Sequence, residues 1–510
     1  MIYAYLYDRS IFVELFFERR RKMAETNELV KIVGKNNVLD SPDILDEYSR
    51  DLSFVPHIRS RCVVKPGNAG EVQEIVKWAN KTLTSLVPVS SGPPHFRGDT
   101  IPSMGGTVIV DLSRMKKIVR IDPKNRVAMV EPGVTFAELQ PELKKAGLSA
   151  YLPLCPRSSK SVIGSMLERE PITMPSHHWD CIDPLLCEEI IFGTGDKLRS
   201  GEAAGPDTIE EQWKIGKAQM VPFGLGQFDE TRLISGAQGT IGIITWATLK
   251  CRFSSRLNRT FLIPSETIEP LIDLSYQLIR IRLGDYCFIV NDLNLASLFS
   301  QGPEEIKTLR DALPRWVLIV SFEGYGELPE EKVQYQEADF RDMVVRTGLL
   351  KPMDMISGVT AEDVSALLSQ PSAEPYWKLK YKGGCHDIFF LTTLDKTPGF
   401  IEAMSTLSQS CRYPSEDIGV YIQPVVQGTS CHLEFDVYYD PANPTEVDKT
   451  KRLATEGSEE LAKMGGFFSR PYGQWAKIAY SRATETTIVQ RKVKKIFDPN
   501  NILNPGKLCF

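Results

Sequence analysis

The sequence predicts an α+β chain with more than one domain, and three observations lead to that prediction. The chain has 510 residues, more than a single hydrophobic core usually organises. From about residue 61, short apolar runs typical of buried strands alternate with helical stripes. After about residue 250 the strict strand–helix–strand rhythm is lost, which favours an antiparallel sheet with helices.

The first half contains the clearest elements. Residues 71–81 place Val72, Ile75, Val76 and Ala79 on one helical face, so we expect an amphipathic helix there. A short strand is expected at the CVV run that starts at residue 62. Further buried strands are expected at residues 86–89, 108–112, 127–130, 188–192 and 241–249.

In the first half, Thr135 followed by Glu138 is also a capping-box signature that predicts a helix start.

The second half contains strands and helices in mixed order. Strands are expected at residues 261–263, 286–291, 316–322, 387–394, 419–425 and 432–439, and helices at 268–282, 329–349 and 487–497.

Composition is that of an ordinary globular protein. Apolar residues make up 42% and charged residues 25%, and the formal net charge is -5. The sequence has no basic stripe with interleaved aromatic residues, which argues against nucleic acid as a partner. The ten cysteines include no CxxC pair, so we expect reduced, mostly buried thiols and a cytoplasmic protein.

The first 22 residues are unusual. Their apolar stretch precedes the basic cluster at residues 19–22, which is the reverse of a signal peptide, and it is too short to span a membrane. Met23 then opens a polar helix start. We interpret residues 1–22 as an extension that is not native, with an amphipathic surface helix as the alternative.

Four stretches carry the functional signal through their order and spacing. Residues 87–112 (VPVSSGPPHFRGDTIPSMGGTVIVDL) form a strand, a Gly/Ser/Pro-rich loop and a strand, and such a loop offers backbone N–H groups to an anionic ligand. Residues 156–166 (PRSSKSVIGSM) combine small hydroxyl residues with Gly164, which permits close backbone approach. The other two are residues 235–245 (SGAQGTIGIIT) and 497–507 (FDPNNILNPGK).

This order resembles the FAD-binding domain shared by the vanillyl-alcohol oxidase, para-cresol methylhydroxylase, D-lactate dehydrogenase and glycolate oxidase flavoproteins. The resemblance covers about residues 61–249 and the tail from about residue 466. It implies two α+β subdomains that hold FAD and a cap domain, with an antiparallel sheet and helices, over the flavin ring. The expected divisions are 23–250 for the FAD domain, 251–465 for the cap and 466–510 for a returning C-terminal segment. The chain has no GxGxxG, so no nicotinamide site is expected.

The first loop departs from the consecutive glycines usual in that family. Gly92 is followed by Pro93, Pro94 and His95, and proline has no N–H to offer a phosphate. Either the neighbouring residues make up the contacts or FAD binding is weaker. His95 is a candidate for a covalent link to flavin, with a hydrogen bond to phosphate or backbone as the alternative. The residues assigned to FAD are Ser90, Ser91, Gly92, His95, Phe96, Arg97, Gly98, Pro156, Ser158, Ser159, Ser161, Gly164, Ser165, Gly239, Thr240, Gly242, Ile243, Asn504 and Lys507.

The cap carries the candidate catalytic residues. The HxGDGNxH and GEHG motifs of the lactate- and glycolate-type relatives are absent, and the segment around Arg470 and Tyr472 looks more like the vanillyl-alcohol and cresol branch. Arg470 could bind a carboxylate or phenolate, and Tyr472 could share a proton with the substrate oxygen. A structural ion pair, with Glu434 or Asp436 as the partner of Arg470, and a core tyrosine are the alternatives.

Two cap histidines are weighed in the same way. His432 shares one face of its strand with Glu434 and Asp436, and that face either meets solvent or lines a pocket. His432 is therefore a candidate base or flavin-linking residue, and His386 is a second candidate catalytic residue. The alternative is that both are ordinary half-buried residues. No second histidine lies two residues from His432, so no metal site is predicted.

The connection at residues 200–235 is long for a compact domain, and long loops tend to be functional. Its Trp213, Met220, Pro222 and Phe223 could cover the site or form an oligomer contact.

The function expected from the resemblance is oxidation of an alcohol or phenol, with hydride passing to flavin N5. A 2-hydroxy acid, held by Arg470 or Arg482, is the alternative substrate class. A flavoprotein subunit of a larger electron-transfer complex is the alternative of a different kind. The expected partners are a small-molecule substrate, an unidentified electron acceptor and further copies of the chain in a homo-oligomer.

Overall fold

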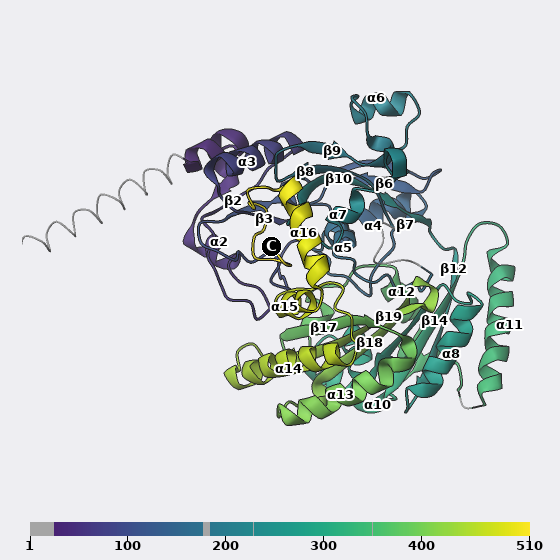
Figure 1. Cartoon of the computed structure of the whole chain (residues 1–510). Helices are drawn as coiled ribbons and strands as arrows, with labels where there is room; N and C mark the ends of the chain where they lie inside the picture. The colour runs from purple at the N-terminus through teal and green to yellow at the C-terminus, as the bar shows by residue number, and fades with distance from the viewer. Residues whose placement is uncertain (1–24, 177–183, 228, 349) are drawn as a thin grey trace, which may run out of the picture.

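The computed structural model describes residues 25–176, 184–227, 229–348 and 350–510. The extension expected at residues 1–22, and Met23 after it, lie outside these ranges. The expected α+β class is confirmed, because parallel and antiparallel sheets occur with helices packed against them. Figure 1 shows two smaller sheets in the upper part of the molecule and one larger sheet in the lower part.

The first sheet is mostly parallel, with the strand order β1-β2-β4-β3. Val72, Ile75, Val76 and Ala79 of α3 are fully buried in its core, which confirms the expected helical stripe. The elements of this region are η1 (Lys35–Asn37), β1 (Val38–Leu39), α2 (Pro42–Glu47), β2 (Cys62–Val64), α3 (Ala69–Thr82), β3 (Leu86–Val89), β4 (Val108–Asp111) and η2 (Leu112–Arg114).

The second sheet is antiparallel, with the strand order β5-β6-β10-β8-β9. The expected capping box is confirmed, since the side chains of Thr135 and Glu138 each accept a hydrogen bond from the other's backbone N–H. The elements are β5 (Ile118–Asp122), β6 (Val127–Val130), α4 (Phe136–Lys145), β7 (Leu148–Ser149), α5 (Val162–Leu167), β8 (Leu185–Phe192), β9 (Lys197–Arg199), β10 (Gly242–Lys250) and β11 (Arg252–Phe253).

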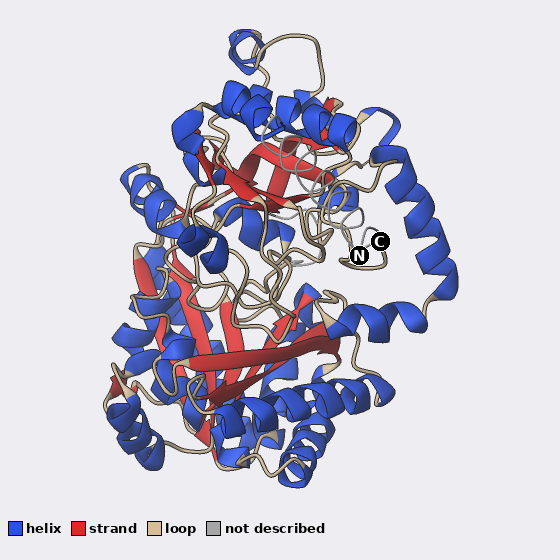
Figure 2. Ribbon diagram, turned by 90° about the vertical axis from the view of Figure 1, so that its left-hand side faces the viewer, coloured by secondary structure: helices blue, strands red, loops and turns tan. Residues whose placement is uncertain are grey.

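The third sheet has six strands, all antiparallel, in the order β12-β14-β13-β18-β19-β17. Helices pack against both of its faces, and Figure 2 shows the sheet in its lower half. The strands are β12 (Leu257–Ser265), β13 (Tyr286–Asn291), β14 (Trp316–Gly324), β17 (Gly384–Thr392), β18 (Ile418–Val425) and β19 (Ser430–Tyr439). The helices and short elements are α8 (Glu269–Arg280), α9 (Asp292–Phe299), α10 (Pro303–Ala312), α11 (Pro329–Thr347), β15 (Met355–Ile356), β16 (Val359–Thr360), α12 (Ala361–Leu368), η5 (Trp377–Leu379), η6 (Leu394–Lys396), α13 (Thr397–Ser410), η7 (Ser415–Asp417), η8 (Val426–Gly428) and α14 (Pro444–Lys463).

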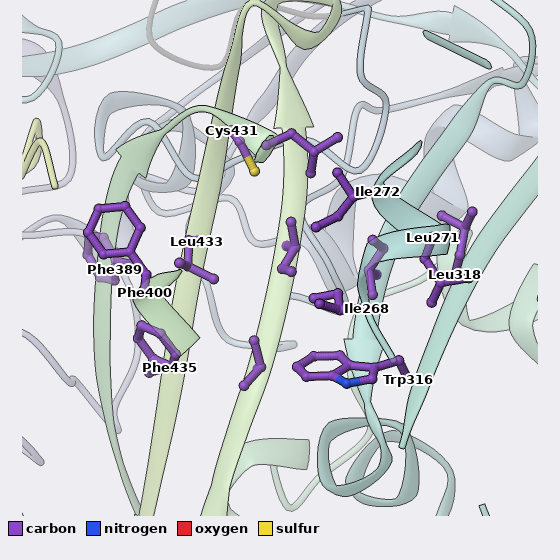
Figure 3. Packing of buried hydrophobic residues seen from close by; sticks show 14 of the residues in the cluster. Ile268, Leu271, Ile272, Trp316, Leu318, Phe389, Phe400, Cys431, Leu433 and Phe435 are labelled. Carbon is purple, nitrogen blue, oxygen red and sulfur yellow. The ribbon is translucent and has the colours of Figure 1, made fainter. Parts of the chain in front are cut away.

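The face of the six-stranded sheet that α8, α11, α13 and α14 cover holds the largest apolar core of the described chain. In Figure 3, Leu433 and Phe435 of β19 lie on the same side as Phe400 of α13, and Ile268 and Ile272 lie beside the strands of the sheet. Alternate residues of β19 point away from this core, so the opposite face of the strand is left for His432, Glu434 and Asp436.

The C-terminal segment returns from the six-stranded sheet to the parallel sheet. After α15 (Gln474–Ser481), α16 (Thr484–Phe497) runs upward in Figure 1, where it is yellow. Leu503 then lies parallel to Leu86 of β3, and the backbone of Leu86 hydrogen-bonds to Ile502 and Asn504 on either side of it. The end of the described chain therefore extends the parallel sheet at its β3 edge.

The segment at residues 200–235 is not the plain loop that its composition suggested. It contains η3 (Gly201–Ala203), α6 (Ile209–Lys214) with a capping box, η4 (Leu225–Gln227) and α7 (Thr231–Ile234). The indole N–H of Trp213 donates to Gln219 Oε1 at 2.7 Å, and its ring packs on the small cluster that contains Met129 and Trp246. Local hydrogen bonds from Thr208 and Glu211 explain the helix, because together they satisfy the first turn.

Two further observations concern the described residues as a whole. None of their helices combines the length and the apolar character that a bilayer crossing requires. The nine cysteines described are all free and buried.

We predict that Lys494→Met destabilises the protein by about 3–5 kcal/mol, because it leaves the buried Asp498 carboxylate without its cation. Lys494 Nζ contacts Asp498 Oδ2 at 2.6 Å and the carbonyl oxygens of Thr240 and Leu503, so it fixes the tail to β10 and β3. Urea denaturation followed by tryptophan fluorescence measures the change. Lys492→Met, on the exposed side of the same helix, is the control. Equal denaturation midpoints for the two variants would contradict the prediction.

Candidate functional site

A long cavity lies between the N-terminal sheets and the six-stranded sheet. One end of it is bounded by the loop after β3, the segment around α5 and the start of β10. The other end is bounded by η5, β17, β18 and β19. The lining residues used below are Ser90, Ser91, His95, Phe96, Arg97, Asp99, Pro156, Arg157, Lys160, Gly164, Glu168, Glu170, Gln238, Gly239, Gly242, Ile243, Tyr376, Trp377, Lys378, Asp387, Tyr421, Glu434 and Tyr472.

The loop after β3 is joined to the loop before α5 by hydrogen bonds. The N–H of Gly92 donates to the carbonyl of Ser159 at 3.0 Å, and the Ser91 hydroxyl accepts from the N–H of Ser161 at 3.0 Å. Arg157 Nη1 donates to the carbonyl of Gly92 at 2.9 Å. These contacts hold the Pro93–Pro94 turn in place although the prolines have no N–H of their own.

Gly164 lies where α5 meets the loop after β3. Its N–H donates to the Ser161 hydroxyl at 2.9 Å, and Ser161 donates in turn to the carbonyl of Pro132 at 2.6 Å. A Cβ atom at Gly164 would come 3.0 Å from Ser90 Oγ and 3.2 Å from Ser161 Cβ. The cavity wall at this point therefore consists of backbone and small side chains.

The start of β10 and the C-terminal tail close the same end of the cavity. Gly239 has a φ of +69°, and a Cβ there would lie 2.4 Å from the Pro88 ring, so no larger residue fits. Asn504 donates to the carbonyls of Asp99 at 2.9 Å and Gln238 at 2.8 Å. Asn504 thus joins two cavity loops from behind.

Charged groups surround the middle of the cavity. Arg97 pairs with Glu168 at 2.6 Å and Glu170 at 3.3 Å, and Lys160 pairs with the same two carboxylates. Within the described residues, Arg157 is a buried guanidinium with no carboxylate in ion-pair range. Burial lowers the Arg157 pKa, so this group favours an anionic ligand that would compensate its charge.

Two titratable residues at this point have shifted pKa values. Burial, followed by the charges of Arg157 and Lys160, lowers the pKa of His95 to about 3, so its imidazole is neutral near pH 7. Burial and the nearby Glu168 raise the pKa of Asp99 to about 6.

The far end of the cavity is aromatic and charged. Tyr376 and Trp377 from η5, Tyr421 from β18 and Tyr472 line it, and Phe96 faces Tyr376 edge-on at 5.7 Å between ring centroids. The same η5 turn carries Lys378, whose ammonium contacts the carboxylates of Asp387, Glu434 and Asp436. In antiparallel pairing, directly opposite residues share a face of the sheet, which explains why Asp387 and Asp436 meet.

The candidate catalytic residues of the cap occupy different positions. Tyr472 lines the cavity directly, whereas His432 lies behind Glu434 and is fully buried. His432 Nε2 is 2.9 Å from Glu434 Oε2, and its Nδ1 is 3.4 Å from Arg470 Nη2. Burial lowers the His432 pKa to about 4 despite the neighbouring carboxylate. The face of β19 that bears His432 is thus buried. Of His432, Glu434 and Asp436, which share this face, Glu434 is the residue that lines the cavity.

Arg470 stacks on the Phe389 ring at 4.0 Å and is 3% exposed. Burial and the charge of the nearby Arg97 lower its pKa to about 10. Neither Glu434 nor Asp436 is its ion-pair partner, because Lys378 takes both. Arg97, which the sequence assigned to FAD, lines the cavity beside Tyr472, and Arg157 lies 5.5 Å from the centre of the Phe96 ring.

A second cavity opens beside the first and shares five residues with it: Phe96, Arg97, Gln238, Asp387 and Tyr472. His386 and Lys507 line only this second cavity. The His386 ring stacks on Phe54 at 4.7 Å, and within the described chain its two buried ring nitrogens have no hydrogen-bond partner. Burial lowers the His386 pKa to about 4.

The remaining residues assigned to FAD shape the wall without lining either cavity. Ser158 bonds to Glu374, Ser165 donates to Glu170 at 2.5 Å, Thr240 donates to the Ala237 carbonyl at 2.7 Å, and the Gly98 N–H donates to Asp51 at 2.6 Å. Trp213, Met220, Pro222 and Phe223 also lie outside the lining of both cavities, so the structure does not support a covering role for them.

Sequence reasoning missed most of the charged and aromatic lining. Arg157 and Lys160 lie in the same stretch as Ser158, Ser159 and Ser161, which were assigned to FAD. Basic residues in this serine-rich loop could have indicated a site for an anion. The run from Tyr376 to Lys378 stood outside every motif, and only its unusual mix of aromatic and basic residues could have singled it out.

One group of potential metal ligands occurs among the described residues: Cys385, Asp387 and Asp436, whose ligand atoms lie within 4.8 Å of one another. The ammonium of Lys378 lies 3.0 Å from Asp387 Oδ1 and 2.6 Å from Asp436 Oδ1. A built-in cation therefore already neutralises these two carboxylates.

Comparison with known proteins agrees with this geometry. Residues 60–185 match a family model described as an FAD binding domain, and residues 429–508 match the C-terminal domain of FAD linked oxidases. The flavoprotein subunit of 4-cresol dehydrogenase (hydroxylating) from Pseudomonas putida is 23% identical, with 93% of each chain covered. D-2-hydroxyglutarate dehydrogenase from Stutzerimonas stutzeri is 24% identical, over 94% of this chain and 98% of that one.

A solved structure of 4-ethylphenol oxidase from Gulosibacter chungangensis has the same fold, with a TM-score of 0.79, 20% identity and coverage of 96% of this chain and 97% of that one. The two domain matches and the relatives thus identify an FAD-dependent oxidoreductase. The sequence is similar to that of FAD-linked oxidases such as 4-cresol dehydrogenase, and the fold matches that of 4-ethylphenol oxidase. Arg157, which has no carboxylate in ion-pair range among the described residues, and the backbone walls at Gly164 and Gly239 fit an anionic dinucleotide.

We predict that Gly164→Val prevents FAD retention, because the branched side chain would fill the space beside Ser90. The absorbance of the purified protein near 450 nm, relative to that at 280 nm, measures bound flavin. Gly105→Val is the control, since a Cβ there meets nothing within 4 Å. A yellow Gly164→Val protein would show that FAD does not approach this wall.

Proposed function

We propose that this protein oxidises an aromatic alcohol or an alkylphenol and passes the hydride to FAD. The observation that carries the proposal is the group of aromatic side chains around Arg97 at the far end of the cavity, with Tyr376, Trp377, Tyr421 and Tyr472. Aromatic walls bury an aromatic ring at favourable stacking distances. The hydride acceptor is supplied by the bound flavin, and the protein orients and polarises the substrate.

Arg97 is the group that we assign to the phenolic oxygen. Its guanidinium lines both cavities, and its carbon Cζ lies 5.3 Å from the Tyr472 ring centre and 5.0 Å from that of Phe389. An arginine next to a phenol favours the phenolate, and a phenolate donates electron density that promotes loss of hydride from the para carbon. Arg470 reinforces this positive potential from behind Phe389.

The FAD contacts are assigned to the other end of the first cavity. Ser90, Ser91, Gly164 and Gly239 form its backbone-rich wall, and the remaining FAD residues of the sequence analysis support that wall from behind. Arg157, which has no carboxylate in ion-pair range among the described residues, supplies positive charge for the anionic part of the cofactor.

Oxidation of a 2-hydroxy acid is the second candidate function. It is favoured by the combined positive charge of two neighbouring buried arginines, Arg97 at the cavity and Arg470 behind Phe389, because this charge attracts a carboxylate. The named relatives include enzymes of both substrate types, 4-cresol dehydrogenase and D-2-hydroxyglutarate dehydrogenase.

Anaerobic reduction of the bound flavin, followed by its absorbance near 450 nm, tests the two candidates. The panel contains 4-hydroxybenzyl alcohol, 4-ethylphenol, D-lactate and D-2-hydroxyglutarate. We expect bleaching by the aromatic compounds. Bleaching by the hydroxy acids alone would replace the first proposal by the second. Bleaching by none of the four would count against both and leave an electron-transfer subunit as the alternative.

We predict that Arg97→Lys lowers kcat/KM for the aromatic substrate by about 10- to 150-fold, which corresponds to roughly 1.5–3 kcal/mol for one charge-assisted contact. A lysine cannot reproduce the planar fork of the guanidinium. Steady-state kinetics measures the change. Arg470→Lys is the matched comparison and should cost less, because Arg470 lies outside the cavity lining. The reverse order of the two losses would make Arg470 the substrate contact.

The sequence left the covalent link to flavin open between His95 and His432, and we assign it instead to His386. The link requires a neutral imidazole with a nitrogen that is not already engaged. Both nitrogens of His432 are engaged, by Glu434 and Arg470. Those of His386 have no partner within the described residues, and the ring adjoins the residues shared by both cavities.

We predict that a proteolytic peptide containing His386 carries the mass of FAD and that His386→Ala releases FAD on acid precipitation. Mass spectrometry and the fluorescence of the denatured protein in a gel measure this. His95→Ala and His432→Ala serve as comparisons that keep the link. Complete release of FAD from the unmodified protein would contradict the assignment.

A further inference from the structure

Lys378 and three carboxylates form a charged cluster on the cavity face of the six-stranded sheet. The ammonium lies 3.0 Å from Asp387 Oδ1 and 2.6 Å from Asp436 Oδ1, and it also contacts Glu434 Oε1. Burial opposes its charge, but the three carboxylates outweigh burial and raise the pKa of Lys378 well above its usual range. Its hydrogen bonds go to Glu434 and Asp436, and it holds Asp387 in an ion pair. Lys378 thus serves as the counter-ion of the three carboxylates.

The three carboxylates differ in what they have left to offer. Glu434 uses its second oxygen for His432, at 2.9 Å. Asp436 is fully buried and uses its second oxygen for the side-chain N–H of Asn294, at 2.7 Å. Asp387 binds Lys378 through Oδ1, and its Oδ2 has no hydrogen-bond partner among the residues that the structure describes. Asp387 is thus the carboxylate of the cluster with a lone oxygen available.

The position of Asp387 gives this oxygen access to substrate. Asp387 lines the first cavity with Glu434 and Lys378, and of these three it alone also lines the second cavity. Arg97 and Tyr472 line the same junction. The junction lies between the aromatic end of the first cavity and the second cavity, whose rim includes the exposed residues Lys451 and Gln474.

We propose that Asp387 is the general base that takes the hydroxyl proton of an alcohol substrate, with Lys378 as its positioning residue. The O–H bond breaks and its proton goes to Asp387 Oδ2. The adjoining C–H bond breaks with both electrons, the hydride is taken up by FAD, and the carbon–oxygen double bond forms. The proton then leaves Asp387 for water through the second cavity. This assignment rests on the proposed oxidation of aromatic substrates, and it narrows the preferred class to those that carry a hydroxyl on the carbon that is oxidised.

Lys378 contributes by holding Asp387 rather than by touching substrate. The ion pair fixes Asp387 Oδ1 and leaves Oδ2 to face the cavity. Glu434 and Asp436 share the ammonium, so they limit how strongly it neutralises Asp387.

The test compares two substrates in the holoenzyme. In 4-hydroxybenzyl alcohol the oxidised carbon bears a hydroxyl, whereas in 4-ethylphenol it does not. We expect Asp387→Asn to lower the rate of anaerobic flavin reduction by the alcohol by about 10²- to 10⁴-fold, with the rate for 4-ethylphenol within about threefold of the unmodified enzyme. The dissociation constant of 4-hydroxybenzaldehyde, read from the flavin spectrum, should change little. Asp342→Asn, on the exposed surface of α11, is the control.

Two further variants separate a base from a structural role. Glu434→Gln should slow both substrates alike, because it changes the cluster without removing the base. Lys378→Met should slow the alcohol more than 4-ethylphenol, since it releases Asp387, and should also lower the melting temperature of the protein. If Asp387→Asn does not retain FAD, Asp387→Glu provides the same comparison, because it keeps a carboxylate but displaces its oxygens.

An equal loss for both substrates in the Asp387 variants, or an unchanged rate for the alcohol, would overturn the assignment of Asp387. Failure of the unmodified enzyme to react with either compound would instead overturn the proposed function. The two failures are therefore distinguishable within one experiment.

Discussion

Buried carboxylates on the cavity face of the six-stranded sheet require a cation in contact with them, and Lys378 meets that requirement. An isolated charge taken out of water costs several kcal/mol, and here Asp387, Glu434 and Asp436 converge within reach of one ammonium. The lysine comes from η5, so the need for it fixes that short turn against the sheet. Tyr376 and Trp377 precede it in the same turn and are thereby brought to the cavity. The aromatic wall thus depends on an electrostatic constraint.

At the opposite end of the cavity, the wall is maintained by short hydrogen bonds between loops. Serine side chains and glycine backbone join the loop after β3 to the loop before α5, and Asn504 joins two loops from the tail. Proline in place of glycine at positions 93 and 94 removes two N–H donors, while the buried Arg157 supplies positive charge nearby. Recognition of an anion at this end thus depends more on side-chain charge than it would with a glycine-rich loop, whose backbone N–H groups bind the anion.

Sequence reasoning succeeded where a local pattern determines the structure. The stripe on α3, the capping box of α4 and the strand Tyr286–Asn291 could be read directly, because periodicity and capping act within a few residues. The α+β class and FAD as cofactor followed from motif order. The segment at residues 200–235 was misjudged because a one-and-a-half-turn helix gives too little periodicity to notice.

The site was harder to predict because its chemistry comes from residues that only the fold brings together. Nothing near Lys378 in the sequence indicates that carboxylates from β17 and β19 will surround it. His432 and Glu434 look equivalent along the strand. In the fold, Glu434 lines the cavity, whereas His432 lies behind it and has no exposed surface. The sequence could place Arg97 in a loop. It could not show that Arg97 lies over the Tyr472 ring, because that contact joins segments far apart in the chain.

The path of the C-terminal tail has a consequence for how the protein is made. Leu503 adds to the edge strand Leu86–Val89, and Asn504 supports the loops on which the cofactor is expected to rest. Everything between Leu86 and Leu503 must leave the ribosome before this pairing can form. Until then the N-terminal sheets keep an incomplete edge at β3. Loss of Leu503 and Asn504 would leave that edge open and the two cavity loops without their bridge.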